Sequence, residues 1–142
     1  MSSENQGTGF SLSGLNILIL GAKLGIGASL ASICANQNAN IILADKEEPL
    51  ELADNLRQKS PANVSAYACD ISDREAVDAL AAKLCKMNCA PHSVAITAGV
   101  TFYNDWIDAD NNTWERDVEQ IFNVNLSGPI NIARSFLPIM EK

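Results

Sequence analysis

Short apolar runs alternate along the chain with longer segments in which apolar residues recur every three or four positions. A continuous apolar run is typical of a strand buried on both faces, and the wider spacing is typical of a helix with one buried face. The runs predict strands at 15–20, 40–44, 64–69 and 93–97. The spaced segments predict helices at 25–35, at 49–59, from 72 through 84, and from 112 toward 140.

The order of these elements predicts an α/β fold built from consecutive βαβ units. Right-handed crossovers would make the four strands parallel, as in the first half of a Rossmann-like doubly wound sheet whose C-terminal half is missing. The fourth strand would then expose an apolar edge at Val94 and Ile96, so we expect the chain to be truncated or this edge to be covered. We assign residues 1–11 to a flexible leader and 12–142 to one domain.

Polar residues mark the expected starts of the last two helices. Ser72 is followed three residues later by Glu75, and Asn112 by Glu115, and each pair matches a capping box. We therefore predict that these helices begin at the two caps. The segment 100–111 is expected to be a loop with room for a short helix.

Composition narrows the class of protein. Hydrophobic residues make up 47% of the chain, yet no apolar run approaches the length that spans a bilayer. The net charge of -7 would repel a nucleic-acid backbone, and the lysines and arginines are scattered. Residues 1–9 are polar and carry no secretory signal. We therefore expect a cytoplasmic protein that binds neither membranes nor nucleic acid.

The cysteines give no clear metal motif. In a reducing compartment, Cys34, Cys69, Cys85 and Cys89 are most simply free thiols. Cys85, Cys89 and His92 could offer three ligands, but their spacing matches no common zinc motif and the sequence nearby offers no obvious fourth ligand. We predict no metal site.

Three glycines, Gly21, Gly25 and Gly27, lie at the junction of the first strand and the first helix. The start of a helix presents unpaired N–H groups and the positive end of the helix dipole, and the missing Cβ atoms would let a diphosphate approach them. A tight turn that needs glycine only for its backbone angles is an equally good interpretation of the triplet alone. The strand, the helix and an acid downstream favour the phosphate site.

That acid is Asp45, at the end of the second strand and 20 residues beyond Gly25. Its carboxylate could accept hydrogen bonds from a ribose and would repel a 2'-phosphate, so the sequence favours NAD over NADP. Lys23 and Lys46 weaken this charge argument. An ordinary polar residue at a strand end is the alternative for Asp45.

Two further strand ends offer candidate contacts. Asp70, after the third strand, could accept a hydrogen bond from an adenine amino group, or it could merely help to cap the next helix. Ala98 and Gly99, after the fourth strand, would allow close approach of a ligand to the backbone. Gly99 could equally begin a loop.

The long final helix carries an amide among apolar residues. Trp114, Val118, Ile121 and Asn125 share one helical face, so Asn125 is expected to point inward. Pro129 has no N–H to donate to the Asn125 carbonyl and should kink the helix there. A core asparagine beside a structural kink is the alternative to a functional amide.

On these residues the chain resembles the short-chain dehydrogenase/reductase family from about Leu12 to Lys142. The matching segments are Gly21-Ala-Lys-Leu-Gly25-Ile26-Gly27, Asp45, Asp70, Ala98-Gly99 and Asn123-Val-Asn125-Leu-Ser-Gly128. The resemblance implies an NAD(P)-binding site formed by Gly21, Lys23, Leu24, Gly25, Ile26, Gly27, Asp45, Asp70, Ile71, Ala98 and Gly99. It also implies that Asn125 is catalytic, with a main-chain carbonyl that holds a water of the proton relay.

The sequence departs from the family pattern at several positions. Leu20 stands where a threonine is usual, and Ile96-Thr97 replace two asparagines, which questions how the cofactor loop is supported. The family's catalytic serine and its Tyr-x-x-x-Lys pair have no counterpart here, since neither Tyr67 nor Tyr103 has a lysine four residues later.

The resemblance therefore implies an NAD(H)-dependent oxidoreductase that acts on an alcohol/carbonyl pair, present as an incomplete N-terminal portion. The alternative is a non-catalytic dinucleotide-binding or assembly module. In the family the long helix packs in a dimer, so we expect a homo-oligomer, with exposed apolar residues at Ile132, Phe136 and Met140 as candidates for the contact.

Overall fold

The computed structural model describes residues 11–102 and 110–140. All but the last residue of the leader expected at 1–11, and most of the loop expected at 100–111, lie outside these residues. The described strands are β1 (Asn16–Leu20), β2 (Asn40–Asp45), β3 (Val64–Ala68) and β4 (Ser93–Ile96). The described helices are α1 (Gly25–Asn36), α2 (Leu50–Lys59), α3 (Arg74–Lys86), α4 (Asn111–Phe122), the π-helix η1 (Asn123–Ser127) and α5 (Gly128–Met140).

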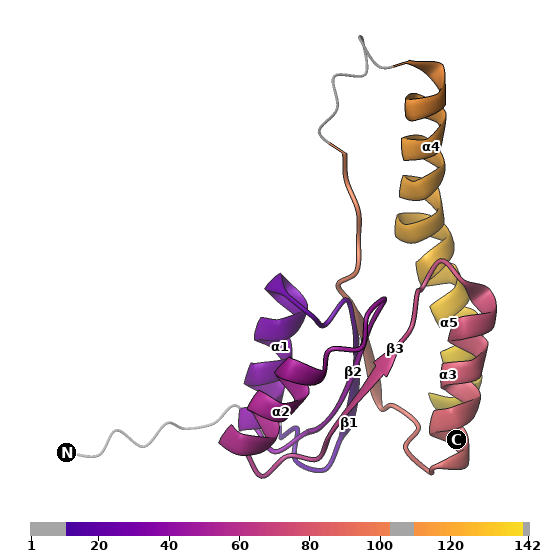
Figure 1. The fold of residues 1–142 in the computed structure, drawn as a ribbon. Coiled ribbons are helices and arrows are strands. Elements are labelled where there is room, and N and C mark those ends of the chain that lie inside the picture. The colour runs from indigo at the N-terminus through magenta and orange to yellow at the C-terminus, as the bar shows by residue number, and fades with distance from the viewer. Residues whose placement is uncertain (1–10, 103–109, 141–142) are drawn as a thin grey trace.

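The four strands form one parallel sheet in the order β3-β2-β1-β4. Helices α1 and α2 cover one face, and α3 and α5 cover the other (Figure 1). This arrangement confirms the predicted α/β class with a Rossmann-like parallel sheet. Strand β4 is an edge of the sheet as expected, and Ile96 on it is 38% exposed.

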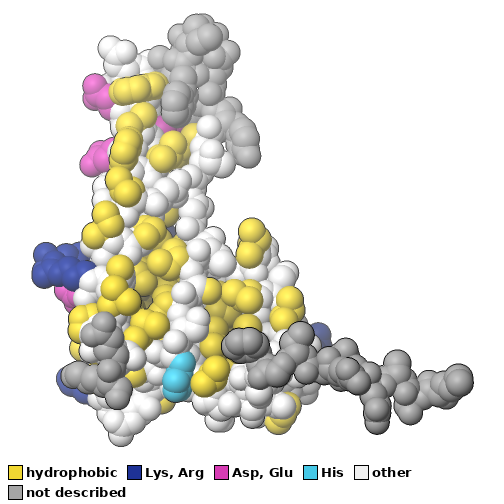
Figure 2. Space-filling model, turned by 180° about the vertical axis from the view of Figure 1, so that it is seen from behind, with side chains coloured by type: hydrophobic (Ala, Val, Ile, Leu, Met, Phe, Trp, Pro, Cys, Tyr) yellow, Lys and Arg dark blue, Asp and Glu magenta, His cyan; other side chains and the backbone are white. Residues whose placement is uncertain are grey.

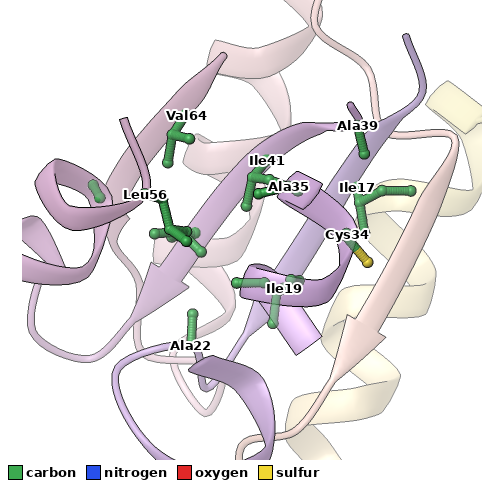
Figure 3. Close-up of a cluster of buried hydrophobic side chains, with 12 residues drawn as sticks. Ile17, Ile19, Ala22, Cys34, Ala35, Ala39, Ile41, Leu56 and Val64 are labelled. Carbon is green, nitrogen blue, oxygen red and sulfur yellow. The ribbon is translucent and has the colours of Figure 1, made fainter. Parts of the chain in front are cut away.

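Both faces of the sheet are buried because successive side chains of a strand point to opposite sides. Ile17 and Ile19 of β1 pack under α1 and α2 (Figure 3). Leu18 and Leu20, which alternate with them along β1, join a second core on the other face of the sheet. This core includes Ile132 and Phe136 of α5. Continuous apolar runs were therefore the correct signal for these strands.

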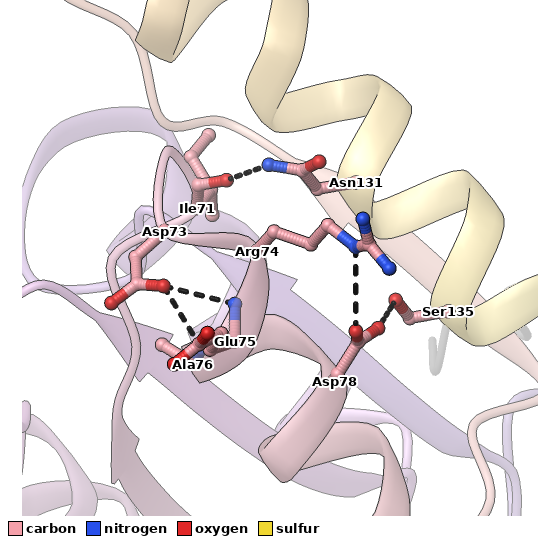
Figure 4. Close-up of polar contacts among 8 residues, drawn as sticks. All are labelled: Ile71, Asp73, Arg74, Glu75, Ala76, Asp78, Asn131 and Ser135. Atoms are coloured by element: carbon pink, nitrogen blue, oxygen red, sulfur yellow. Dashed lines mark hydrogen bonds and ion pairs between the residues drawn. The ribbon is translucent and has the colours of Figure 1, made fainter.

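Polar contacts fix α5 against the start of α3 (Figure 4). The Asn131 amide donates to the Ile71 carbonyl at 3.1 Å, and the Ser135 hydroxyl donates to Asp78 at 2.5 Å. Asp78 also pairs with Arg74 at 3.6 Å. The long final helix is thus attached to the sheet through α3.

This packing corrects the prediction of the exposed face. Ile132 and Phe136 are buried and Met140 is half-buried, so the first two are not available to a partner. Other large apolar residues of the same helical run are more than half exposed, namely Phe122, Leu126, Ile130 and Leu137. Figure 2 shows hydrophobic side chains along the upper helix and over the body below it.

None of the helices in the described residues is long and apolar enough to span a membrane.

The two predicted capping boxes are wrong. Asp73 caps α3, because its carboxylate accepts from the amides of Glu75 and Ala76. The Ser72 hydroxyl instead donates to Asp70. In the same way Asp110, rather than Asn112, caps α4 by accepting from the Thr113 amide.

The expected disruption at Pro129 takes the form of a π-helix. The Gly128 amide donates to the Asn123 carbonyl, five residues earlier instead of four. A proline that lacks the N–H of the α-helical pattern favours such a local change of spacing. The hydrogen-bond spacing of the helical run therefore changes within η1, the segment that contains Asn125.

The amino ends of the strands are joined by side-chain amides. Asn63 donates to Asn40, Asn40 donates to Asn16, and Asn16 donates to the Ala90 carbonyl. The backbone N–H of Asn16 donates to Nδ1 of His92 at 2.9 Å. His92 therefore has a structural role at the end of the sheet opposite the cavity described below.

Candidate functional site

A cavity of about 610 Å³ lies at the carboxyl ends of the four strands. Residues that directly follow each strand form its floor, where ligands bind in open parallel sheets. The predicted site residues that line it are Gly21, Lys23, Leu24, Asp45, Asp70, Ile71, Ala98 and Gly99. The start of α1, with Gly25, Ile26 and Gly27, does not line it, and Asn125 lines a separate cavity.

The glycine turn is shaped first by protein packing. Gly21 has φ +85°, and a Cβ there would lie 2.3 Å from the Ala98 nitrogen. A Cβ at Gly27 would lie 2.2 Å from the Gly21 carbonyl oxygen. Gly25 has φ +60° and open space beside it. Both interpretations of the triplet therefore have support, since two glycines are needed for packing and Gly25 leaves room at the helix start.

The N-terminus of α1 has no side-chain cap and no acidic residue in its first turn. Its cap position is Leu24, which has extended backbone geometry. By contrast, α3 and α4 are capped by Asp73 and Asp110. An uncapped helix start leaves donors and positive potential for an anion.

Thr97 supports the turn from β4. Its hydroxyl lies 2.9 Å from the Leu20 carbonyl oxygen and 3.0 Å from that of Gly21, and it donates to them. The Thr97 amide also donates to Leu20. Thr97, which directly follows β4, thus provides a hydroxyl that supports the turn, whereas the family pattern has a threonine at the position of Leu20.

Asp45 holds the turn from β2. One carboxylate oxygen accepts from the Lys23 amide at 2.9 Å, and the other accepts from the Lys46 amide at 2.8 Å. The carboxylate is therefore fixed at the mouth of the cavity. Each oxygen has further lone pairs that a ligand hydroxyl could use.

Both lysines beside Asp45 are paired with acids. Lys23 forms a close ion pair with Glu47. The Lys46 ammonium lies 3.3 Å from Oδ2 of Asp70. Each cation that weakened the charge argument in the sequence thus has an acid partner within the protein, whereas the Asp45 carboxylate accepts from two backbone amides.

Asp70 is held as an anion at the end of β3. Burial alone would raise its pKa, but hydrogen bonds from the Ser72 hydroxyl and amide and the Lys46 ammonium together lower it. The Ser72 bonds both go to Oδ1, at 2.6 and 2.9 Å. Asp70 therefore does not cap α3, and its carboxylate lines the cavity.

Cys69 also lines the cavity but is not a candidate nucleophile. Burial, followed by the charges of Asp70 and Asp73, raises the pKa of its thiol to about 11. The thiol is neutral at physiological pH, and the neutral form is a poor nucleophile.

Helix α4 forms a wall that the sequence interpretation missed. Arg116, Glu119 and Gln120 of α4, with Asn123 at the start of η1, line the cavity. Figure 1 shows α4 extending past the carboxyl ends of the strands. These residues are spaced on one helical face, so a polar stripe was visible in the sequence. Its position over the cleft depends on tertiary packing.

Asn125 joins η1 to the end of β4. Its side-chain oxygen accepts from the Val100 amide at 2.9 Å, and its side-chain nitrogen donates to the Val100 carbonyl at 2.8 Å. The side chain is exposed, so the expectation of an inward, buried amide is wrong. Asn125 and Pro129 line a second, more open cavity of about 430 Å³ beside Gly99.

Known proteins resemble this chain over most of its length. A family model described as short chain dehydrogenase matches residues 15–142. An uncharacterized oxidoreductase of Schizosaccharomyces pombe is 28% identical over 134 residues, which cover 94% of this chain and 50% of that protein. Oxidoreductase UcpA of Salmonella typhimurium is 30% identical over 132 residues, which cover 92% and 48%.

Solved structures share the fold. L-sorbose reductase from Gluconobacter frateurii, complexed with NADPH and L-sorbose, superposes with a TM-score of 0.78 at 24% identity, covering 92% of this chain and 49% of that one. The chain thus spans about half the length of the relatives it matches.

Proposed function

The chain belongs to the short-chain dehydrogenase family, and on that premise we propose that its cavity binds NAD(H) for hydride transfer to or from an alcohol or carbonyl compound. Membership implies a nicotinamide dinucleotide and a small-molecule substrate. The preference for NAD(H), the substrate class and the residue roles are the proposed parts.

The residues around the cavity fit a dinucleotide. Its volume of about 610 Å³ falls within the range of roughly 300–1,000 Å³ that ligand pockets occupy. Leu24, at the cap of α1, lines the cavity, so the uncapped helix start lies at its edge and provides backbone donors for a pyrophosphate, with Gly25 leaving space beside them. Asp45 at β2 and Asp70 at β3 provide acceptors for a ribose and an adenine amino group.

The carboxylate of Asp45 carries the preference for NAD(H). Two backbone amides hold it in place, and the neighbouring Lys23 and Lys46 are each paired with another acid. A 2'-phosphate placed there would meet the fixed negative charge of Asp45, and the neighbouring Lys23 is held by Glu47. A ribose hydroxyl would instead donate to the same oxygens.

In the proposed reaction the bound cofactor supplies or accepts the hydride. The residues of this chain bind and orient it through the start of α1, Asp45 and Asp70. We assign Asn125 to the proton relay, as the family resemblance implies. Its side chain is fixed to Val100, and Pro129 cannot donate to its carbonyl, which supports a carbonyl available to a water.

Titration calorimetry with NADH and NADPH tests the cofactor preference. We expect saturable NADH binding that is tighter than NADPH binding, and Asp45→Asn should reduce the ratio of the two affinities by about tenfold, because it removes one unit of charge near the 2'-position. Asparagine keeps an acceptor for only one of the two backbone amides, so circular dichroism of the variant is needed to check that the chain remains folded. Asp54→Asn, on the exposed side of α2, is the matched control and should leave the ratio unchanged.

Tighter binding of NADPH, or a ratio unaffected by Asp45→Asn, would overturn the preference. Failure of the folded chain to bind either dinucleotide would overturn the site itself.

A non-catalytic dinucleotide-binding or assembly module is the second candidate. It is favoured by the exposed apolar residues along the final helical run, namely Phe122, Leu126, Ile130 and Leu137. Dinucleotide binding without turnover of any alcohol or carbonyl compound by the complete protein would support this candidate over the oxidoreductase.

A further inference from the structure

Asp70 divides its two carboxylate oxygens between different partners. Oδ1 accepts from the amide and the hydroxyl of Ser72, which belong to the same turn. Oδ2 is the oxygen that faces Lys46, at 3.3 Å from the ammonium nitrogen. Because Oδ1 already accepts two hydrogen bonds from Ser72, a ligand that donates to Asp70 would bind Oδ2, the oxygen beside Lys46.

The backbone explains why Lys46 reaches this oxygen. The Lys46 amide donates to Asp45, which fixes residue 46 at the end of β2. Strand β2 pairs with β3, and Asp45 lies opposite Ala68, two residues before Asp70. The Lys46 side chain thus crosses the mouth of the cavity between two adjacent strand ends.

This ion pair can exchange. The Lys46 side chain is 75% exposed and that of Asp70 is 31% exposed. Water can solvate a displaced ammonium group, and exposed ion pairs contribute little stability. A group that donates to Oδ2 therefore displaces Lys46 without leaving a buried charge unpaired.

We propose that Lys46 tunes which purine base the cavity accepts, by occupying Oδ2 of Asp70 until an exocyclic amino group takes its place. The inference rests on the proposed dinucleotide function. Adenine carries such an amino group, which in this proposal takes the place of Lys46 at Oδ2. Hypoxanthine has a carbonyl oxygen at that position, which the carboxylate repels and the Lys46 ammonium can bridge. Lys46 thus weakens adenine binding and assists hypoxanthine binding.

Calorimetry of Lys46→Met with NADH and with reduced nicotinamide hypoxanthine dinucleotide tests this role. We expect NADH to bind to the Lys46→Met variant about two- to fivefold more tightly than to the unmodified chain. This is the range of affinity change that the loss of an exposed ion pair supports. The hypoxanthine dinucleotide should bind less tightly, so the adenine-to-hypoxanthine ratio increases. Lys59→Met, at the end of α2 outside the cavity, is the matched control and should not change the ratio.

A merely structural role for Lys46 would change both affinities together and leave their ratio constant, and that result overturns the inference. An equal loss of both affinities would instead make Lys46 a contact to a part that the two dinucleotides share, which also overturns it. If the unmodified, folded chain binds neither dinucleotide, the proposed function fails and this inference fails with it. Binding with an unchanged ratio overturns the inference alone.

Discussion

Thr97 provides a test at the scale of single residues. Its hydroxyl donates to the Leu20 and Gly21 carbonyls across the glycine turn. Thr97→Val keeps the shape of the side chain and removes the donor. We expect the free energy of unfolding to fall by about 1 kcal/mol and NADH to bind more weakly, because the turn loses a hydrogen bond. Chemical denaturation and calorimetry measure the two effects.

Thr97→Ser keeps the hydroxyl and is the control for this pair of measurements. This variant should keep the cofactor affinity and most of the stability of the unmodified chain. If Thr97→Val were as stable as the unmodified chain and bound NADH equally well, the hydroxyl would have no role in the turn.

Individual site residues were predictable where they follow a strand directly. Asp45 and Asp70 were placed at the cavity from the sequence, because the carboxyl ends of parallel strands meet at one edge. The pairing of Lys46 with Asp70 was not predictable, since it joins residues 24 positions apart through the β2–β3 register. The position of Arg116 in the lining of the cavity also depends on tertiary packing, so the local sequence does not predict it.

At the scale of elements, the start of α3 has two neighbouring candidates for its N-cap, Ser72 and Asp73. Asp73 accepts from the amides of Glu75 and Ala76. We expect Asp73→Ala to lower the free energy of unfolding by about 1 kcal/mol, because two amide donors lose their acceptor. Asp73→Asn keeps an acceptor and should cost much less. Urea denaturation of the two variants measures the difference, and equal stabilities would argue against Asp73 as the cap.

Strand positions were predicted to within about one residue, whereas the capping residues were not. Ser72 and Asp73 both have side chains suited to an N-cap, so the local sequence does not choose between them. The choice follows from the turn, where the Ser72 hydroxyl is already bonded to Asp70. The π-helical form of the disruption at Pro129 was likewise not predictable, because a proline also permits a simple kink.

At the scale of the whole molecule, the parallel sheet with β4 at an edge followed from the βαβ pattern, but the orientation of α5 did not. Both Phe136 and its neighbour Leu137 are large and apolar. Periodicity shows that a helix has an apolar face, and it does not show which residues the sheet covers. The packing of α5 against α3 and the sheet decides that Phe136 is buried.

Alanine substitutions at these two neighbours test this orientation. Phe136 is 1% exposed and joins the core beneath the sheet, whereas Leu137 is 54% exposed. We expect Phe136→Ala to lower the free energy of unfolding by about 3–5 kcal/mol, a large part of the roughly 5–15 kcal/mol of a typical domain. Leu137→Ala should change it by less than about 0.5 kcal/mol. Denaturation of both variants, monitored by circular dichroism, gives the comparison. Similar losses for the two would mean that α5 is rotated or covered on its outer face, and Phe136 would then lose its role in fixing the long helix that forms the wall of the cavity.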